Sequence, residues 1–326
     1  MYEANAIGPG NIAIIKYWGA RNPDINLPLN DSVSITLDEN ISVKTHLKFS
    51  SSFSRDRLIL NDIEIQPNEI KLHMGRLLRR VREMSGLEIF AEIRSVTNFP
   101  VSAGLASSAA GSAALAVGAN EALGLDLDLN ELSKLARLGS GSGARSIFGG
   151  FVEWEKGSRM DGSDSFARQI FSKDYWPELI DLIAITSTEP KPVPSNEGME
   201  ITSKSSSLFE CRISNVEKDI NPLIDAIKQR DERKLYEIAM RQSNNMHAMI
   251  LDSWPHFFYL NEKSLKIMKW ISQSEIAGYT FDAGPNAHIL TTKHKVGEVE
   301  KFLETIGIRK VIKSQPGDGA RTVISG

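Results

Sequence analysis

The chain has 326 residues, a formal net charge of −3 and no basic block. This length exceeds what one compact core usually holds, so two packed domains are expected. Hydrophobic residues make up 41% of the chain and charged residues 24%, as in an ordinary globular protein. The charge balance argues against a nucleic-acid or anionic-membrane partner. It leaves room for an anionic small molecule, whose site needs only local positive charge.

Targeting signals and cysteine usage predict a cytoplasmic protein. Residues 1–15 lack a basic segment followed by a long apolar core, and no apolar run approaches the roughly 18 residues that a spanning helix needs. Cys211 is the only cysteine, so no intramolecular disulfide can form. It is either a small, partly buried core residue or half of an intermolecular disulfide in a symmetric dimer. No histidine pairs with another at metal-ligand spacing, so no structural zinc site is expected.

Hydrophobic periodicity predicts both strands and helices in the first half of the chain. The predicted strands cover residues 41–49 and 87–96, and the predicted helices cover residues 68–84, 106–123 and 129–138. Residues 58–65 have the pattern of a hairpin that turns near Asn61 and Asp62. The helix over residues 106–123 is rich in alanine, which favours tight packing.

The mixture continues through the rest of the chain, which is interrupted by a polar, proline-rich stretch at residues 188–194. The predicted strands cover residues 149–155, 179–186, 276–281, 287–291 and 309–313, and the predicted helices cover residues 197–212, 222–230, 232–249, 261–273 and 296–306. We place the domain boundary in the stretch, which gives an N-terminal domain over residues 1–187 and a C-terminal domain over residues 188–326. The expected fold class is α+β.

Residues 99–111 follow a predicted strand and open a predicted helix with a run of small residues. Small residues let the backbone approach a ligand, Ser107 and Ser108 offer hydroxyls, and the helix start offers free N–H groups. The run is therefore either a polyphosphate site or a tight helix entry packed on a sheet. It is not a Walker loop, because no Gly-Lys-Ser/Thr follows.

The same run resembles the Pro-x-x-x-Gly-Leu-x-Ser-Ser-Ala phosphate loop of the GHMP superfamily, which contains galactokinase, homoserine kinase, mevalonate kinase and phosphomevalonate kinase. Further segments resemble the mevalonate diphosphate decarboxylase family. They are residues 11–19, 27–37, 140–154, 195–199, 245–248, 259–261 and 279–287, the last reading Tyr-Thr-Phe-Asp-Ala-Gly-Pro-Asn-Ala. The resemblance implies a two-domain GHMP-kinase-like fold, with an N-terminal ribosomal-S5-like domain and a C-terminal ferredoxin-like α/β domain that closes the substrate cleft. It also implies a homodimer.

The chemistry implied by the resemblance is ATP-dependent decarboxylation of mevalonate 5-diphosphate, in isoprenoid biosynthesis, with ATP and Mg²⁺. Asp282 is expected to orient the 3-hydroxyl and accept its proton. Lys16, flanked by apolar residues and so partly buried, is expected beside Asp282 and the transferred phosphoryl group. Arg145 is expected to hold the carboxylate that leaves as carbon dioxide. No dedicated protein metal site is expected, because Mg²⁺ would arrive with ATP and contact Ser107 or Ser108.

The resemblance also assigns two groups of binding residues. The expected substrate-binding residues are Ala13, Tyr17, Trp18, Gly19, Lys71, Ser140, Gly141, Ser142, Ser195, Asn196, Met199 and Ala283. The expected ATP-binding residues are Asn98, Ala103, Gly104, Leu105, Ala106, Ser107, Ser108 and Gly111.

Three departures from the family pattern concern the phosphate contacts. Ala20 stands where a second lysine is usual, with Arg21 one position further, and Asn196 stands where some bacterial members have arginine. The phosphate loop has Val101 and Ser102 where Thr-Ala is common. Three alternatives therefore stay open: a mevalonate 5-phosphate decarboxylase, a kinase of the same fold without decarboxylation, and a catalytically silent metabolite-binding protein.

Overall fold

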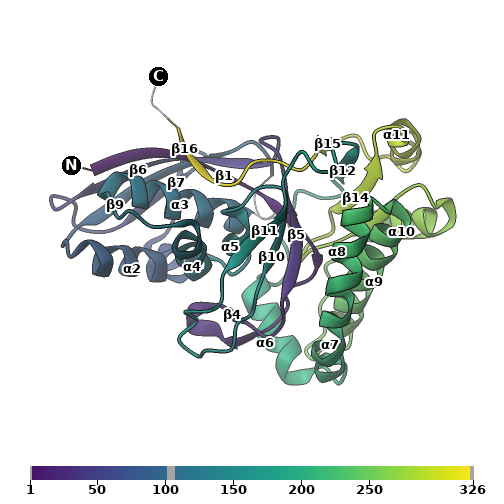
Figure 1. Cartoon of the computed structure of the whole chain (residues 1–326), viewed down its shortest axis with the longest axis horizontal. Coiled ribbons are helices and arrows are strands. Elements are labelled where there is room, and N and C mark those ends of the chain that lie inside the picture. Colours follow the sequence, from purple (N-terminus) through teal and green to yellow (C-terminus); the bar gives the residue numbers. More distant parts are fainter. Residues whose placement is uncertain (1, 101–106, 324–326) are drawn as a thin grey trace.

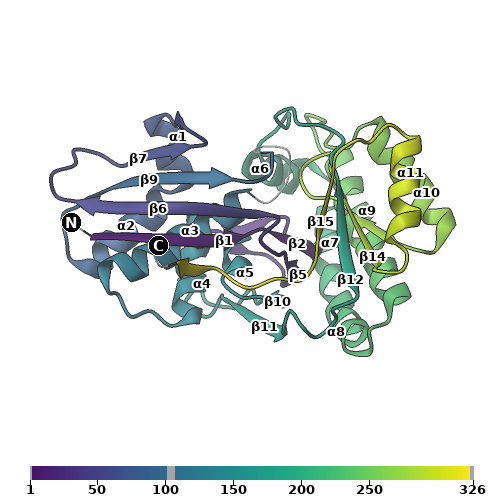
Figure 2. The same cartoon turned by 90° about the horizontal axis from the view of Figure 1, so that it is seen from above.

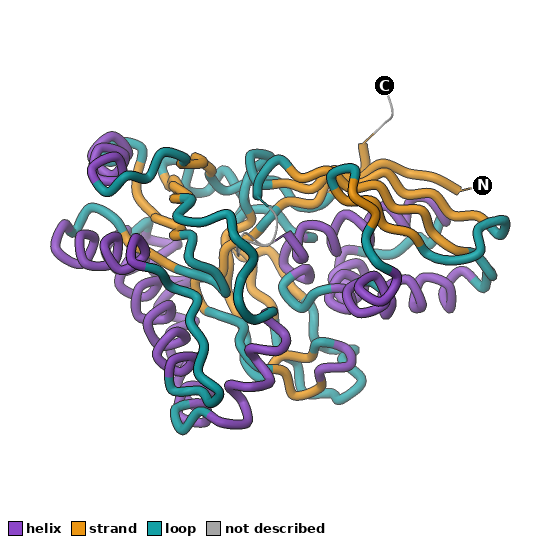
Figure 3. Tube along the Cα trace, turned by 180° about the vertical axis from the view of Figure 1, so that it is seen from behind, coloured by secondary structure: helices purple, strands orange, loops and turns teal. Residues whose placement is uncertain are grey.

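The computed structural model describes residues 2–100 and 107–323. Its sheets and helices form two lobes side by side, one holding the N-terminal strands and the other most of the C-terminal helices (Figure 1). Seen from behind, the strands that carry the chain termini and the helices of the second lobe lie at opposite ends of the molecule (Figure 3).

The first lobe is built on a six-stranded sheet with the order β16-β1-β6-β9-β7-β8. Its strands are β1 (Tyr2–Pro9), β6 (Ser42–Ser50), β7 (Arg57–Leu60), β8 (Ile63–Glu64), β9 (Phe90–Thr97) and β16 (Arg321–Val323). Neighbours pair antiparallel, except that β7 and β9 run parallel. The last strand of the chain thus returns to the first lobe and pairs with β1.

Helices cover one face of this sheet (Figures 1 and 2). They are α1 (Pro67–His73), α2 (Gly75–Ser85), α3 (Ser107–Leu123), α4 (Leu129–Gly139) and the short α5 (Gly143–Ser146). Helix α3 lies against β1 so closely that a Cβ on Gly8 would stand 2.0 Å from the carbonyl oxygen of Ala110. The alanine-rich sequence therefore permits a close helix-to-strand approach, as predicted.

A second sheet, with the order β11-β10-β5-β2, stands between the two lobes. Its strands are β2 (Asn11–Ile15), β5 (Ser32–Thr36), β10 (Phe151–Trp154) and β11 (Ala167–Phe171), and a small pair β3 (Ala20–Asn22) and β4 (Leu27–Pro28) flanks a one-turn 3-10 helix at Pro23–Ile25. All five residues of β2 and of β5 are buried. The chain leaves β2 directly into Lys16.

The second lobe has an antiparallel sheet with the order β13-β14-β12-β15. Its strands are β12 (Leu179–Ala184), β13 (Gly278–Thr280), β14 (Ala287–Thr292) and β15 (Val311–Ser314). Its helices are α6 (Ser195–Ser205), α7 (Phe209–Val216), α8 (Ile220–Gln229), α9 (Glu232–Leu251), α10 (Glu262–Ser274) and α11 (Val296–Thr305), with a one-turn 3-10 helix at Glu217–Asp219.

The two faces of the sheet in the second lobe belong to different cores. Ile183 and Leu290 join the core that also contains Ile12 of β2 and Leu235 of α9. The alternate residues of the same strands join Ile267 of α10 and neighbouring residues in a separate core. This alternation follows from the period of two along a strand, and it makes the first of these cores common to both lobes.

Two helices predicted as continuous are interrupted. The predicted helix over residues 68–84 breaks at Met74, whose φ of −125° lies outside the helical range. The predicted helix over residues 197–212 breaks at Ser206, where the backbone is extended. The side chain of Asp252 accepts hydrogen bonds from Ser206 and Ser207 at this break. Oγ of Ser206 also accepts a hydrogen bond from the backbone N–H of Leu208, two residues further on, and such a local bond competes with helix continuation.

Other sequence predictions concern single residues. The hairpin at Asn61 and Asp62 is confirmed, since both residues have positive φ, as a two-residue turn of this kind requires. The prediction that Cys211 is a core residue is wrong: the side chain is exposed on α7. Across residues 2–100 and 107–323, no helix is long and apolar enough to cross a membrane.

Candidate active site

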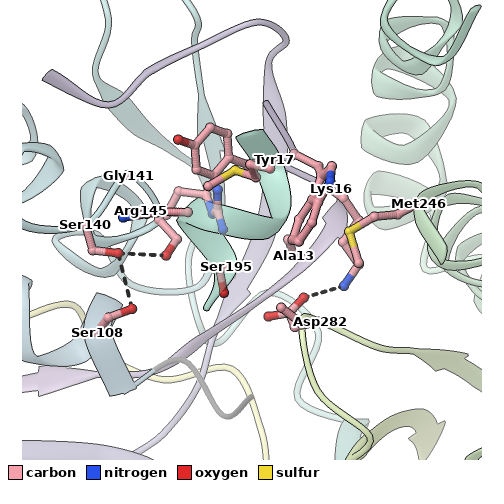
Figure 4. A pocket seen from close by; sticks show the side chains of 15 residues that line it. Ala13, Lys16, Tyr17, Ser108, Ser140, Gly141, Arg145, Ser195, Met246 and Asp282 are labelled. Carbon is pink, nitrogen blue, oxygen red and sulfur yellow. Dashed lines mark hydrogen bonds and ion pairs between the residues drawn. The ribbon is translucent and has the colours of Figure 1, made fainter. Parts of the chain in front are cut away.

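A cleft opens between the two lobes and receives residues from both (Figure 4). It encloses about 620 Å³, counted with the space that opens to solvent. The lining residues come from β2 and the turn after it, the start of α3, α5 and the segment before it, α6, α9 and the loop between β13 and β14. They are Ala13, Lys16, Tyr17, Trp18, Ser108, Ser140, Gly141, Ser142, Arg145, Ser195, Asn196, Met199, Met246, Asp282 and Ala283.

An ion pair joins the lobes at the base of the cleft. Lys16 follows β2, and Asp282 follows β13 after one intervening residue. The Nζ atom of Lys16 lies 2.7 Å from Oδ1 of Asp282, with the lysine side chain 2% exposed and the carboxylate 29% exposed. Burial lowers the pKa of Lys16, and Asp282 opposes that shift. The carboxylate of Asp282 is thus held by Lys16 through Oδ1, and the Asp282 side chain also lines the cleft.

Positive charges around Asp282 favour its ionised form. Burial would raise the pKa of Asp282, but Lys16, His288 and Arg145 outweigh it and hold the pKa below its usual value. His288 lies on β14 and contacts a second carboxylate, with its Nδ1 2.6 Å from Oδ2 of Asp181 and both side chains 3% exposed. The site therefore presents an ionised carboxylate, as a general base requires.

Arg145 is buried with no carboxylate partner among the described residues. Its Nε and Nη2 donate to Oδ1 of Asn11 at 3.2 and 3.0 Å, and its Nη1 donates to Oγ of Ser32 at 2.8 Å. The guanidinium also lies 5.9 Å from the ring centre of Trp154. Burial lowers its pKa to about 10, so the group is still a cation at neutral pH. These neutral neighbours fix the orientation of the planar Arg145 guanidinium and leave its positive charge available to an anion in the cleft.

Hydroxyl groups line the cleft wall that the first lobe supplies. Oγ of Ser140 lies 3.3 Å from Oγ of Ser108 and 3.3 Å from Oγ of Ser142 (Figure 4). Gly141 lies between these serines, and a Cβ there would stand 2.8 Å from the ring of Tyr17. Any larger residue would displace the tyrosine, so glycine is required where the loop passes this ring.

The structure brings together most of the predicted substrate residues but not all of them. Gly19 lies outside the lining, at a turn with φ of 122°, and Lys71 is exposed on α1. Among the predicted ATP residues, Ser108 lines the cleft, while Asn98 hydrogen-bonds the backbone of Ser42 and Glu39. Ser107 and Gly111 lie on α3 outside the lining, and Ala103, Gly104, Leu105 and Ala106 lie outside the described residues.

Sequence reasoning missed several residues at the site. Met246 on α9 lines the cleft, and Asn11 and Ser32 orient Arg145. Lys191 lies beside Ser195, to whose Oγ its Nζ donates at 2.8 Å. Burial lowers the pKa of this lysine, and Asp282 opposes the shift. The polar, proline-rich sequence around Lys191 indicates a linker and gives no signal of a half-buried cation beside the cleft.

Among residues 2–100 and 107–323, no group of three or more His, Cys, Asp or Glu side chains is placed to hold a metal ion. The hydroxyl of Ser108 at the cleft is an oxygen donor of the kind that Mg²⁺ accepts when phosphates supply the other ligands.

Known proteins match the chain over nearly its whole length. The sequence model of the diphosphomevalonate decarboxylase-like N-terminal domain matches residues 8–167, and that of the mevalonate 5-diphosphate decarboxylase C-terminal domain matches residues 181–320. The diphosphomevalonate decarboxylase of Candida albicans is 43% identical over 304 residues, which cover 89% of this chain and 84% of the relative.

Solved structures of mevalonate diphosphate decarboxylases are also similar to this chain. A structure described as MDDEF in complex with MVAPP, AMPPCP and magnesium has a TM-score of 0.92 and 36% identity, covering 99% of each chain. Mevalonate diphosphate decarboxylase from Staphylococcus aureus has a TM-score of 0.92 and 32% identity, covering 99% of this chain and 98% of the other.

The two lobes, the phosphate-loop helix α3 and the cleft between the lobes define a protein of the GHMP small-molecule kinase class, with the α+β fold expected from the sequence. Within that class, the chain belongs to the diphosphomevalonate decarboxylase family.

Proposed function

We propose that the chain catalyses the ATP-dependent decarboxylation of mevalonate 5-diphosphate to isopentenyl diphosphate, with ADP, phosphate and carbon dioxide as the other products. One observation carries the proposal: in a chain of this family, the Lys16–Asp282 pair and the free charge of Arg145 face one cleft. These are the groups that phosphorylation of a tertiary alcohol and loss of a carboxylate need. The relatives named diphosphomevalonate decarboxylase support the same reaction.

Asp282 acts first, on the 3-hydroxyl. A tertiary hydroxyl is a poor nucleophile toward phosphorus, and an ionised carboxylate within reach can orient it and take its proton. Lys16 keeps that carboxylate ionised through their contact at 2.7 Å. The lysine also carries positive charge to the position where the phosphoryl group is transferred. The phosphoryl group is then attached to the 3-oxygen of the substrate.

Arg145 acts in the second stage, when phosphate departs from C3 and the C1–C2 bond breaks. Carbon dioxide can leave only if that bond is aligned with the orbital that empties at C3. The guanidinium can grip both oxygens of the substrate carboxylate, because it is planar and its neighbours Asn11 and Ser32 prevent rotation. The electron pair of the broken bond then forms the alkene between C2 and C3.

The nucleotide is expected on the wall formed by the start of α3. Ser108 and the free N–H groups of the first helical turn can hold phosphate oxygens there. When bound, Mg²⁺ neutralises charge on the phosphates, and Ser107 or Ser108 is the candidate for its contact with this chain. The magnesium and the nucleotide analogue AMPPCP named with the similar structure support both as partners of this chain.

Contacts to the far end of the substrate distinguish the diphosphate from the monophosphate. Arg21 does not compensate for Ala20, because its Nη1 and Nη2 donate to the carbonyl oxygens of Pro28 and Arg159 at 2.9 and 3.2 Å. Tyr17, Ser195 and Asn196 line the cleft and remain available for phosphate oxygens. The MVAPP bound in the similar structure favours the diphosphate.

The test is ADP release measured in parallel with mevalonate 5-diphosphate and mevalonate 5-phosphate. The diphosphate should have a kcat/KM higher by about 10- to 100-fold, which is the effect of one or two lost charge-assisted hydrogen bonds. Equal values, or a preference for the monophosphate, would assign this chain to the alternative substrate.

The homodimer is proposed on the family resemblance, the cytoplasmic location on the single cysteine, and the domain division on the proline-rich stretch at residues 188–194. The chain is expected to work as a homodimer in the cytoplasm. Its N-terminal domain over residues 1–187 would carry the nucleotide wall, and its C-terminal domain over residues 188–326 would close the cleft. Two strands cross this division, since β12 belongs to the sheet of the second lobe and β16 returns to the sheet of the first.

A further inference from the structure

Arg212 is a buried cation that the proposed reaction does not use. It lies on α7 of the second lobe and is 2% exposed. Its Nη2 donates to the main-chain carbonyl oxygen of Lys16 at 3.1 Å. Its Nε and Nη1 are buried and have no hydrogen-bond partner within residues 2–100 and 107–323. No carboxylate among the described residues forms an ion pair with it.

This arrangement is unfavourable for stability. Burial lowers the pKa of Arg212 to about 10, so the group is still charged at neutral pH. A buried charge without a counter-ion carries a desolvation cost that a single neutral hydrogen bond does not offset, and an apolar side chain of similar volume is commonly as stable or more stable. Residues that lower stability in this way are found where function requires them.

The carbonyl that Arg212 contacts belongs to the catalytic lysine. A second donor, Nδ2 of Asn30, reaches the same oxygen at 3.1 Å, so both lone pairs of the Lys16 carbonyl are used. Lys16 stands just beyond β2, whose pairing with β5 is already irregular between Ala13 and Ile15. The ladder therefore does not fix this peptide group, and side chains from elsewhere must do so.

The contact of α7 extends past Lys16 to the turn that follows it. Trp18 and Phe209 belong to one buried cluster. A Cβ on Gly19, whose φ is 122°, would stand 2.9 Å from the ring of Phe209. The helix of the second lobe thus holds the segment over residues 16–19 by a hydrogen bond and by packing.

We propose that Arg212 is a positioning residue, which fixes the main chain of Lys16 from the second lobe so that its ammonium group meets Asp282. The inference rests on the proposed role of Lys16 in catalysis. Asn30 supplies the second point of attachment. Because two donors hold the carbonyl of Lys16, the main chain at this residue is fixed in position. Its side chain can therefore place Nζ against Oδ1 of Asp282 in a single orientation. Small displacements of reacting groups cost large factors in rate.

The test is Arg212→Met, which keeps volume and removes both the charge and the donor. The carbonyl of Lys16 keeps its bond from Asn30, so no buried acceptor is left unpaired. We expect kcat for ADP release to fall by about 10- to 100-fold with KM for both substrates within about twofold. The melting temperature should stay equal or rise. Unchanged kcat with a lower melting temperature would show a purely structural role and overturn the proposal.

Arg137→Met is the matched control. Arg137 is also buried, but it donates to the carbonyl oxygens of Ile25 and Gly162 and has no contact with Lys16. The carbonyl oxygen of Gly162 keeps its hydrogen bond from the N–H of Ser165, but that of Ile25 loses its donor. The melting temperature should therefore fall while kcat of the folded enzyme changes by less than about threefold. A loss of kcat in the control as large as in Arg212→Met would contradict a specific role for Arg212.

Asn30→Ala provides the second variant, should Arg212→Met fold poorly. It should lower kcat with KM little changed, and the double variant should lose less than the product of the two single losses, because both residues act on one carbonyl. Multiplicative losses would contradict the shared carbonyl. Amide exchange of Tyr17 separates this inference from the proposed function: it should quicken in Arg212→Met and not in Arg137→Met, even if the wild-type chain turns over neither phosphomevalonate.

Discussion

Asp282→Asn should lower kcat by about 10²- to 10⁴-fold, the usual effect of losing a general base, while KM for ATP and for the phosphomevalonate changes little. The amide keeps an oxygen that Lys16 can reach, but it cannot take the proton of the 3-hydroxyl. Because surrounding cations hold the pKa of Asp282 below its usual value, the wild-type carboxylate is ionised at neutral pH. Wild-type activity should therefore not decline through protonation of Asp282 as the pH falls from about 8 to 6.

Steady-state kinetics and isothermal titration with ATP and substrate check this expectation. Cys211→Ser is the control for handling, since the exposed thiol lies outside the cleft lining and should leave kcat unchanged. An Asp282→Asn enzyme that retains more than about half of wild-type kcat would remove the general-base role.

Arg145→Lys should be nearly as damaging as Arg145→Ala, with kcat lower by about two orders of magnitude or more and KM raised only modestly. Lysine keeps the charge but loses the planar fork, and a point charge fixes distance without fixing rotation. It also cannot reproduce the three hydrogen bonds that Arg145 makes to Asn11 and Ser32. The carboxylate would then bind, but its C1–C2 bond would be misaligned with C3.

The measurement is carbon dioxide release in a single turnover, together with the melting temperature of each variant. Full activity of Arg145→Lys would mean that this residue supplies charge alone. A lower melting temperature in both variants, with kcat of the folded enzyme preserved, would mean that Arg145 only packs against its loop.

The sequence predicted best those elements whose cause is local. The alanine-rich run predicted helix α3, and the adjacent turn residues Asn61 and Asp62 predicted the hairpin. The apolar neighbours of Lys16 gave its burial. Each of these signals lies within a few residues of the feature that it predicts.

The rest depends on segments far apart in the chain. Strands β1 and β16 pair although they lie at opposite ends of the sequence, and the sequence pattern of neither strand indicates its pairing partner. Arg212 contacts a carbonyl almost two hundred positions away, and the sequence around it reads as an ordinary helix surface. The frequent burial of cysteine favours the core reading of Cys211 over an intermolecular disulfide, yet the side chain is exposed on α7.

The ratio of carbon dioxide to ADP tests the account most directly. With mevalonate 5-diphosphate labelled at C1, MgATP and the wild-type chain, released carbon dioxide and ADP should rise together in a ratio of about one to one, because each phosphorylation of the 3-hydroxyl commits one carboxylate to leave. Isopentenyl diphosphate should accumulate at the same rate. ADP formed without carbon dioxide would show a kinase that stops after phosphoryl transfer, and it would contradict the role given to Arg145 and the decarboxylation itself.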